Sequence, residues 1–266
     1  MLERVLVAAV GLLLLVPALI WGGTLAVGIL VPVCLAISMD EYARMAFPKD
    51  RWPSLFWLVS VGGTLYAIGL YHPLHFGMAV AGAMLAAFLF VLFRPEPIAT
   101  AADRVGRYLL GAVWIGGSYA ALTALRGLDH GLAWMTMALC LAWFADTGAY
   151  FAGRFFGRRK LYERISPKKT WEGYFGGILV TVSGMFGIRA WFLTELTVLD
   201  CLLLGSVVGT AGVLGDLSES MVKRSLDVKD SGTLMPGHGG LLDRVDSVLF
   251  IAPLLLAYAV VVKGVG

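Results

Sequence analysis

The chain has 266 residues, of which 59% are hydrophobic and only 15% charged, and its mean hydropathy is +0.81. A water-soluble domain of this length needs far more polar surface, so the composition excludes an ordinary soluble protein and indicates one that crosses a membrane repeatedly. The formal net charge of +3 gives no case for nucleic-acid binding, whereas basic loops suit the anionic headgroups of membrane lipids.

Nine apolar segments are long enough to span a membrane as helices, and they predict an all-α, polytopic fold. Their approximate bounds are 5–21, 24–39, 53–71, 76–93, 108–125, 131–151, 173–193, 197–214 and 247–263. With a cytoplasmic N-terminus, the segments on the cytoplasmic side contain 18 of the 21 lysines and arginines. This asymmetry follows the positive-inside rule, so the nine spans and the cytoplasmic N-terminus support each other.

The first apolar segment, 5–21, has an alternative interpretation as a cleaved signal peptide, because a charged start followed by an apolar run is typical of one. The apolar character continues to Met39 without a clear small-residue cleavage pattern, which favours a hairpin of two retained spans. The chain has no long N-terminal extension, from which we expect a bacterial inner-membrane protein.

The first half of the chain, residues 1–130, has the composition of a transmembrane scaffold. Its cysteine, Cys34, lies in an apolar span, as do the other two of the chain, so none indicates a disulfide or zinc framework. Asp40 and Glu41 follow the second span. They are either a solvated helix end, partners of a basic loop, or contacts of the active site.

The second half, residues 131–266, contains the unusual polarity, and we predict the catalytic domain there with cytoplasmic loops at 152–172 and 215–246. Asp146 lies within an apolar span, where an unpaired carboxylate is costly. It is therefore a candidate for binding substrate or metal, or else a buried partner of a lysine.

The segment Ser166-Pro167-Lys168-Lys169-Thr170-Trp171-Glu172-Gly173 predicts a helix start, with Ser166 as N-cap and Pro167 at the first helical position. Lysines in a first turn oppose the helix dipole unless an anion such as a phosphate binds there. Lys168 and Lys169 also serve as inside-positive charges, and the two roles are compatible.

Residues 216–246 form a polar island that holds 10 of the 39 charged residues. Its first part places Asp216, Glu219, Ser220, Lys223 and Arg224 on one helical face. Asp243 and Asp246, three residues apart, share a face at the start of the last span. Two carboxylate-bearing helix ends are suited to a hard cation such as magnesium. The alternative, intrahelical ion pairs worth about 0.3–0.5 kcal/mol each, leaves the clustering at span ends unexplained.

The loop Pro236-Gly237-His238-Gly239-Gly240 is rich in glycine, which lets backbone N–H groups approach an anion closely. His238 could act as a general base, a phosphate donor or a loop-positioning residue. A phosphate nucleophile is already ionised near neutral pH, so we favour phosphate contact or loop positioning.

Together these segments resemble the phosphatidate cytidylyltransferase family, also called CDP-diacylglycerol synthases. The family signature runs Ser-x-apolar-Lys-Arg, four residues, Lys-Asp-x-small, a Pro-x-His-Gly-Gly turn and Asp-Arg-apolar-Asp. In this chain its parts are Ser220–Arg224, Lys229–Gly232, Pro236–Gly240 and Asp243–Asp246. Met235 departs from the usual Leu, Ile or Phe, which is a conservative change. The resemblance is strong over 140–250 and limited to hydropathy in the first half.

The resemblance implies the reaction of CTP with phosphatidic acid to give CDP-diacylglycerol and pyrophosphate in phospholipid biosynthesis. It also implies magnesium bound at Asp216 and Asp243, with or without a second cation, and a homodimer. We expect magnesium-dependent in-line attack of the lipid phosphate on the CTP α-phosphate at the cytoplasmic side of the membrane, with no nucleic-acid partner.

From the residue patterns and the resemblance together we predict two sets of site residues. The catalytic set is Asp216, Asp243, Asp246, Lys223, Arg224 and His238, and its three aspartates also form the predicted metal site. The substrate-binding set is Asp146, Ser166, Lys168, Lys169, Thr170, Glu219, Lys229, Asp230, Gly239, Gly240 and Arg244.

Two other functions compete with this prediction. One is a CTP-dependent polyprenol or dolichol kinase. The other is a transporter, whose acidic residues would be expected near the middle of the membrane. In this chain the acidic residues gather at span ends beside a glycine-rich loop, which favours an enzyme.

Overall fold

The computed structural model describes residue 17 and residues 21–235 and 239–265. Contacts divide the chain into two units. Unit 1 comprises residues 1–124 and 230–242, and unit 2 comprises residues 125–229 and 243–266. The described residues are mostly helical, and their one sheet has only two short strands, which confirms the predicted all-α fold.

Seven helices in the described part of the chain are long and apolar enough to cross a membrane. They are Gly23–Ala46, Arg51–Tyr71, Pro73–Leu92, Ile98–Gly127, Gly131–Phe156, Val198–Ser225 and Leu242–Val262. They match all the predicted spans except two. The span predicted at 173–193 is helical but is not among the seven, and most of 5–21 lies outside the described residues. The polytopic fold is confirmed, whereas the count of nine and the side of the N-terminus stay predictions.

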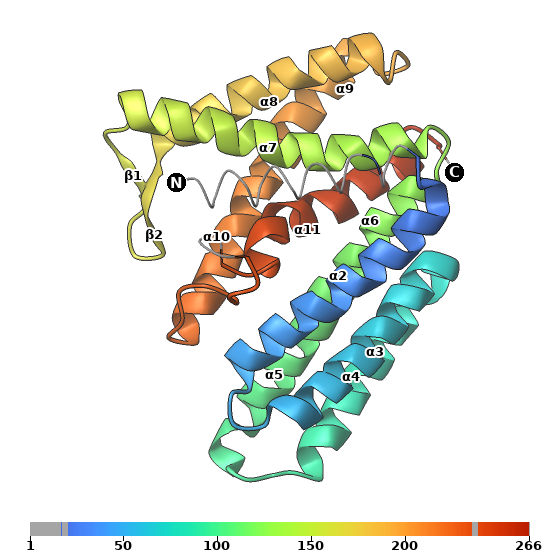
Figure 1. Ribbon diagram of the computed structural model, residues 1–266, viewed down its shortest axis with the longest axis vertical. Helices are drawn as coiled ribbons and strands as arrows, with labels where there is room; N and C mark the ends of the chain where they lie inside the picture. The colour runs from blue at the N-terminus through green and yellow to red at the C-terminus, as the bar shows by residue number, and fades with distance from the viewer. Residues whose placement is uncertain (1–16, 18–20, 236–238, 266) are drawn as a thin grey trace. The chain divides into compact units, whose positions relative to one another are not determined.

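Unit 1 consists of helices joined by short turns. Its elements are α2 (Gly23–Ala46), α3 (Arg51–Tyr71), η1 (Pro73–His75), α4 (Phe76–Leu92), η2 (Ile98–Thr100), α5 (Ala101–Gly111), η3 (Ala112–Gly117) and α6 (Ser118–Gly127). The last four follow one another without a break, and the boundary between the units falls inside α6. α3 lies beside α4 (Figure 1).

The helices of unit 1 are joined by buried hydroxyl groups and by a close glycine contact. The Ser38 hydroxyl lies 2.9 Å from that of Tyr119, and the Tyr42 hydroxyl donates to the Arg107 carbonyl at 2.8 Å. A Cβ on Gly116 would lie 2.5 Å from the Gly62 carbonyl oxygen. Backbones that approach so closely in an apolar environment need a residue without a side chain.

Unit 2 contains the hairpin and the remaining helices. Its elements are α7 (Gly131–Phe156), β1 (Lys160–Tyr162), β2 (Ser166–Thr170), α8 (Trp171–Trp191), α9 (Val198–Leu203), η4 (Leu204–Val208), α10 (Gly209–Ser225), α11 (Leu242–Ala257) and η5 (Tyr258–Val262). α7 and α8 run side by side, joined at one end by the β1–β2 hairpin (Figure 1). Their contact depends on glycine, because a Cβ on Gly148 would lie 2.6 Å from the Gly176 carbonyl oxygen.

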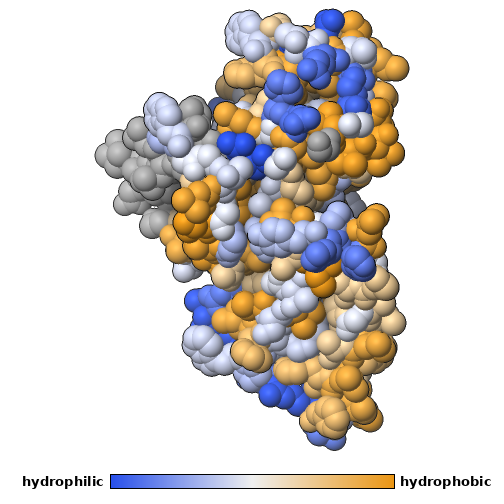
Figure 2. Space-filling view, turned by 90° about the vertical axis from the view of Figure 1, so that its right-hand side faces the viewer, coloured by the Kyte–Doolittle hydropathy of each residue, from blue (hydrophilic) through white to orange (hydrophobic). Residues whose placement is uncertain are grey.

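Large apolar side chains are exposed along the helices of both units. Examples are Phe56 and Leu85 in unit 1 and Phe175 and Leu179 in unit 2. Hydrophobic surface covers much of the face in Figure 2. Exposed apolar surface of this extent is expected for helices that lipid surrounds.

The two units are defined by contacts and carry no functional assignment. The division into a scaffold at 1–130 and a catalytic domain at 131–266 therefore stays a prediction. The structure adds that residues 230–242, from the predicted catalytic half, belong to unit 1.

Candidate active site

The segment predicted to begin a helix at Pro167 instead forms strand β2, so that prediction was wrong. β2 pairs antiparallel with β1, with Lys160 opposite Thr170 and Tyr162 opposite Ser166. The helix begins at Trp171, and the Thr170 hydroxyl accepts the Gly173 N–H at 3.1 Å. Thr170 caps α8 in place of Ser166, because pairing with β1 keeps the preceding residues extended.

Glu172, in the first turn of α8, fixes the base of this hairpin. Its carboxylate accepts the backbone N–H of Arg158 at 3.0 Å and that of Arg159 at 3.2 Å. These bonds, that from Arg158 first, hold the pKa of Glu172 below its ordinary value of 4.5. The interaction orders the start of the hairpin that carries Lys168 and Lys169.

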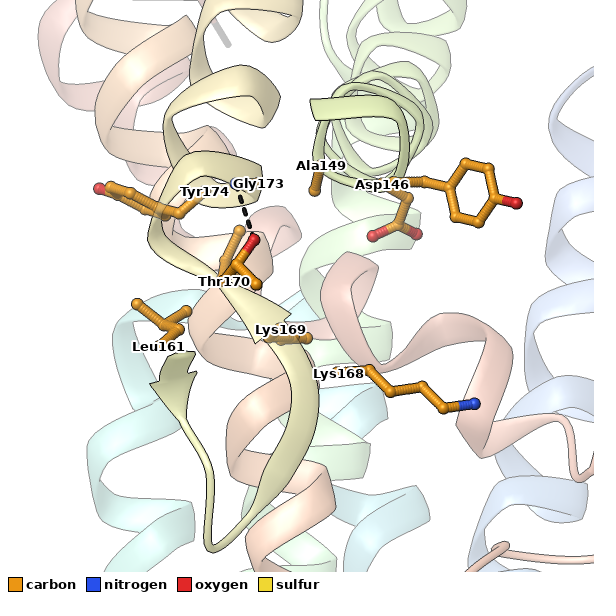
Figure 3. Close-up of a pocket in the computed structure, with 10 residues that line it drawn as sticks. Asp146, Ala149, Leu161, Lys168, Lys169, Thr170, Gly173 and Tyr174 are labelled. Carbon is orange, nitrogen blue, oxygen red and sulfur yellow. Dashed lines mark hydrogen bonds between the residues drawn. The ribbon is translucent and has the colours of Figure 1, made fainter. Parts of the chain in front are cut away.

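A cavity of about 190 Å³ lies between the hairpin and the helices of unit 2. Its polar wall includes Asp146, Lys168, Lys169 and Thr170 (Figure 3). The rest of the wall is formed by Ala149, Tyr150, Leu161, Gly173, Tyr174 and Val213. Figure 3 shows the Asp146 carboxylate pointing from α7 toward the strand that carries the two lysines. Four predicted substrate-binding residues therefore share one cavity.

Helix α10 contributes Asp216 to the same region of unit 2. The Lys169 ammonium lies 2.7 Å from Asp216 Oδ2, and the Ser220 hydroxyl donates to Asp216 Oδ1 at 3.3 Å. Asp146 interacts electrostatically with Asp216, Lys169 and Arg244. The structure thus brings together residues from both polar segments of the sequence.

A second cluster of charges lies further along α10. The Lys223 ammonium lies 2.5 Å from Glu219 Oε2 and also contacts Asp243 Oδ1. The side chains are only 10%, 1% and 5% exposed for Lys223, Glu219 and Asp243. The helical-face prediction placed Glu219 and Lys223 correctly, and the predicted intrahelical pair is present as well. Lys223 is a buried bridge between two carboxylates in this structure.

The remaining aspartate of the predicted metal site is Asp246, on α11. It interacts electrostatically with Asp216, Asp146 and Lys223, and its Oδ1 accepts the Ser247 N–H at 2.6 Å. Carboxylates on α7, α10 and α11 of unit 2 therefore interact electrostatically with one another.

The donor set fits a magnesium ion in chemical type, although it does not form a ready ligand cluster. In the described part of the chain no group of three or more His, Cys, Asp and Glu side chains is arranged to hold a metal. However, Glu219 Oε1 is buried and has no hydrogen-bond partner among the described residues. Carboxylates that face one another with an unsatisfied oxygen among them are suited to a hard cation. The metal site at Asp216, Asp243 and Asp246 stays a prediction.

The other predicted residues have varied surroundings. Arg224 is exposed and donates to the Val228 carbonyl at 3.1 Å, and Lys229 and Asp230 are exposed. Gly239 has a φ of +80° and its carbonyl accepts the Met235 N–H at 2.9 Å. His238 lies outside the described residues.

Glu41, for which the sequence left three roles open, is a buried acidic residue of unit 1 and therefore not a solvated helix end. Glu41 is 4% exposed and accepts backbone N–H groups from Leu241 and Leu242. Gly240 packs against the same carboxylate. A carboxylate at the end of an apolar helix was the available signal, but the sequence does not reveal partners about 200 residues away.

The fold and the charged cavity define a class of protein: a polytopic membrane protein with a polar site, suited to anionic ligands, at the ends of its helices. The sequence profile described as the Cytidylyltransferase family matches residues 2–262, and the chain belongs to that family.

Similar proteins are named phosphatidate cytidylyltransferase. The one from Synechocystis sp. is 33% identical over 99% of this chain and 98% of its own length. The one from Bacillus subtilis is 43% identical over 58% of this chain and 57% of its own length, and one from Staphylococcus epidermidis is 45% identical over 48% and 49%. The chain thus spans about half the length of these last two relatives.

Proposed function

We propose that this protein is a phosphatidate cytidylyltransferase, which converts CTP and phosphatidic acid to CDP-diacylglycerol and pyrophosphate. The observation that carries the proposal is the cavity of unit 2, whose wall includes Lys168, Lys169 and Asp146, with Lys169 ion-paired to Asp216. Paired cations and carboxylates of this kind suit a reaction between two phosphate-bearing substrates. The family membership and the names of the relatives support the same reaction.

The chemistry requires two polyanions to meet. A phosphate oxygen of the lipid forms a bond to the α-phosphorus of CTP, and the bond from that phosphorus to the oxygen bridging to the β-phosphate breaks, releasing pyrophosphate. The attacking oxygen is already ionised near neutral pH, so the site needs no strong base. Lys168 and Lys169 hold phosphate oxygens, and the aromatic and aliphatic wall beside them, which includes Tyr150 and Leu161, accommodates less polar parts of the substrates.

The carboxylates of this site have a complementary role. Asp216, Asp243 and Asp246 would hold magnesium, and Glu219 supplies a further buried oxygen. When bound, magnesium supplies positive charge that neutralises and aligns the phosphates. Lys223 keeps Glu219 and Asp243 in place by contacting both.

The cellular setting belongs to the same proposal. Several helices able to span a membrane indicate a multi-pass protein, and the distribution of Lys and Arg supports a site on the cytoplasmic face of the cell membrane. There CTP is available and phosphatidic acid can enter from the bilayer. A homodimer is part of the proposal by resemblance to the family.

A direct assay tests the function. Purified protein in detergent receives CTP, magnesium and phosphatidic acid, and both pyrophosphate and liponucleotide are measured. We expect the two products in equal amounts, and neither when magnesium is omitted. A cooperative thermal unfolding transition shows that the purified protein is folded. Folded protein that forms no product would contradict the proposal. CDP and a phosphorylated polyprenol, formed when a polyprenol is supplied instead, would indicate a CTP-dependent lipid kinase.

A further inference from the structure

The Glu41 carboxylate accepts several hydrogen bonds within unit 1. The proposed function gives this side chain no role. Its Oε1 accepts the Leu241 N–H and its Oε2 accepts the Leu242 N–H, each at 2.8 Å. The Ser231 hydroxyl donates to Oε2 at 3.3 Å. One side chain of α2 thus bonds to residues on both sides of the glycine-rich loop.

Two glycines of the same segment leave room for this carboxylate. A Cβ on Gly232 would lie 2.8 Å from Glu41 Oε1, and a Cβ on Gly240 would lie 2.6 Å from the same atom. Neither glycine has a positive φ, so the requirement comes from close packing rather than from backbone conformation. The backbone at Gly232 and at Gly240 is therefore packed closely against Glu41.

The hydrogen bonds that Glu41 accepts stabilise the backbone at Leu241 and Leu242. Hydrogen bonds from backbone N–H groups to a carboxylate are stronger than those to a neutral acceptor, and losing the acceptor leaves buried N–H groups unsatisfied. Helix α11 begins at Leu242, and a carboxylate near a helix N-terminus interacts favourably with the positive end of the helix dipole. Glu41 thus stabilises the backbone immediately before Asp243.

We propose that Glu41 is a positioning residue for the reaction: its hydrogen bonds with Ser231, Leu241 and Leu242 fix the backbone from which Asp243, Arg244 and Asp246 follow. The inference rests on the proposed function, because its kinetic consequence is measured in that reaction. Neighbouring Asp40 has a different role, since its carboxylate pairs with Arg44 and Arg51 at 2.7 and 2.6 Å.

Two variants disturb the carboxylate by different routes. Glu41→Gln keeps the size of the side chain but removes its charge and one acceptor oxygen. Gly232→Ala leaves Glu41 intact but places a Cβ 2.8 Å from its Oε1. The matched controls are Asp40→Asn, which removes a charge one residue away, and Gly106→Ala, whose Cβ would meet nothing within 4 Å. Hydrogen exchange of the backbone amides at 239–242 is measured by mass spectrometry together with kcat and KM for CTP.

We expect both variants to speed exchange at Leu241 and Leu242 by about tenfold to a hundredfold, while exchange in α3 and α4 stays unchanged. We also expect kcat to fall by about tenfold to a hundredfold. The KM for CTP should change less than about threefold, because the residues that contact the substrate remain. Both controls should match wild type in exchange and in kcat.

The two readouts separate the possible failures. Wild-type exchange at 241 and 242 in Glu41→Gln would overturn the inference whatever the activity. Faster exchange with an unchanged kcat would make Glu41 a purely structural clamp and also overturn it. If the wild-type protein forms no product, the proposed function fails, and the kinetic part of this inference fails with it. Faster amide exchange at Leu241 and Leu242 in Glu41→Gln would still show that Glu41 stabilises this backbone.

Discussion

Lys169 and Asp216 form an ion pair of 2.7 Å between strand β2 and helix α10, and their side chains are 25% and 30% exposed. Each is therefore the counterion of the other before any ligand arrives. A phosphate that binds Lys169 must compete with Asp216, and a cation that binds Asp216 must compete with Lys169. When a phosphate and a cation bind together, each charged side chain gains a new partner, so this competition is removed. The ion pair is therefore suited to a phosphate that binds as a complex with a cation.

Replacing Lys169 by Met should lower kcat/KM for CTP by about tenfold to a hundredfold, because a charge-assisted bond to phosphate is lost. The thermal midpoint should change little, since the ion pair is partly exposed. Initial rates at varied CTP measure the effect. Arg164→Met, in the exposed hairpin turn, is the control. Equal kinetics for the Lys169 and Arg164 variants would remove Lys169 from the phosphate site.

Asp243→Asn should reduce turnover by about a hundredfold or more while the protein stays folded. The fold should survive because Lys223 retains its contact with Glu219. Product formation and thermal unfolding are measured on the same preparation. Near-normal activity would exclude Asp243 from the metal site.

Lys223→Met should destabilise the protein by about 3–5 kcal/mol, since it leaves the Glu219 carboxylate buried without the cation that contacts it. The thermal midpoint in detergent should fall clearly. Adding Glu219→Gln should restore part of the loss, because it removes this buried charge. Lys229→Met, at an exposed position, is the control for charge removal, and a double variant no more stable than the single one would contradict this account.

Glu172→Gln should lower the thermal midpoint at pH 7, where the wild-type carboxylate is ionised and accepts the N–H groups of Arg158 and Arg159. The pKa of Glu172 is lowered in the folded state, so its stabilising effect is complete above its ordinary value of 4.5. The effect is lost as the pH falls through the lower folded-state pKa. Wild type and variant should therefore converge in acid.

Midpoints recorded from pH 7 down to about pH 3 test this linkage. Glu163→Gln, in the exposed hairpin turn, should follow wild type throughout. A difference between wild type and Glu172→Gln that stays constant over the whole range would mean that the effect comes from packing rather than from ionisation.

Gly148→Ala should destabilise unit 2 by about 1–3 kcal/mol, because the added Cβ would lie 2.6 Å from the Gly176 carbonyl oxygen. Gly187→Ala on α8 is the matched control, since its Cβ would meet nothing within 4 Å. Thermal midpoints of the two variants give the comparison. If both variants behave alike, the close contact between α7 and α8 contributes little.

The parts of the structure that local pattern determines could be predicted from the sequence. Long apolar runs predicted the spanning helices, and helical spacing placed Glu219 and Lys223 on one face of α10. The hairpin was missed because Ser166 and Thr170 are both acceptable N-caps, and the choice depends on pairing with β1. The contacts of Glu41 could not be predicted from local sequence either, because they join positions about 200 residues apart.

The glycine contacts between α7 and α8 constrain how the cavity can open. Backbone meets backbone along this helix pair, with Gly176 so close to Ala152 that an added Cβ would lie 2.1 Å from the Ala152 Cβ. Rolling or sliding of one helix against the other would press these atoms together, so the packing disfavours relative motion of α7 and α8. Widening of the cavity is therefore expected at the β1–β2 hairpin or at α10, which also line it or lie beside it, and not between α7 and α8.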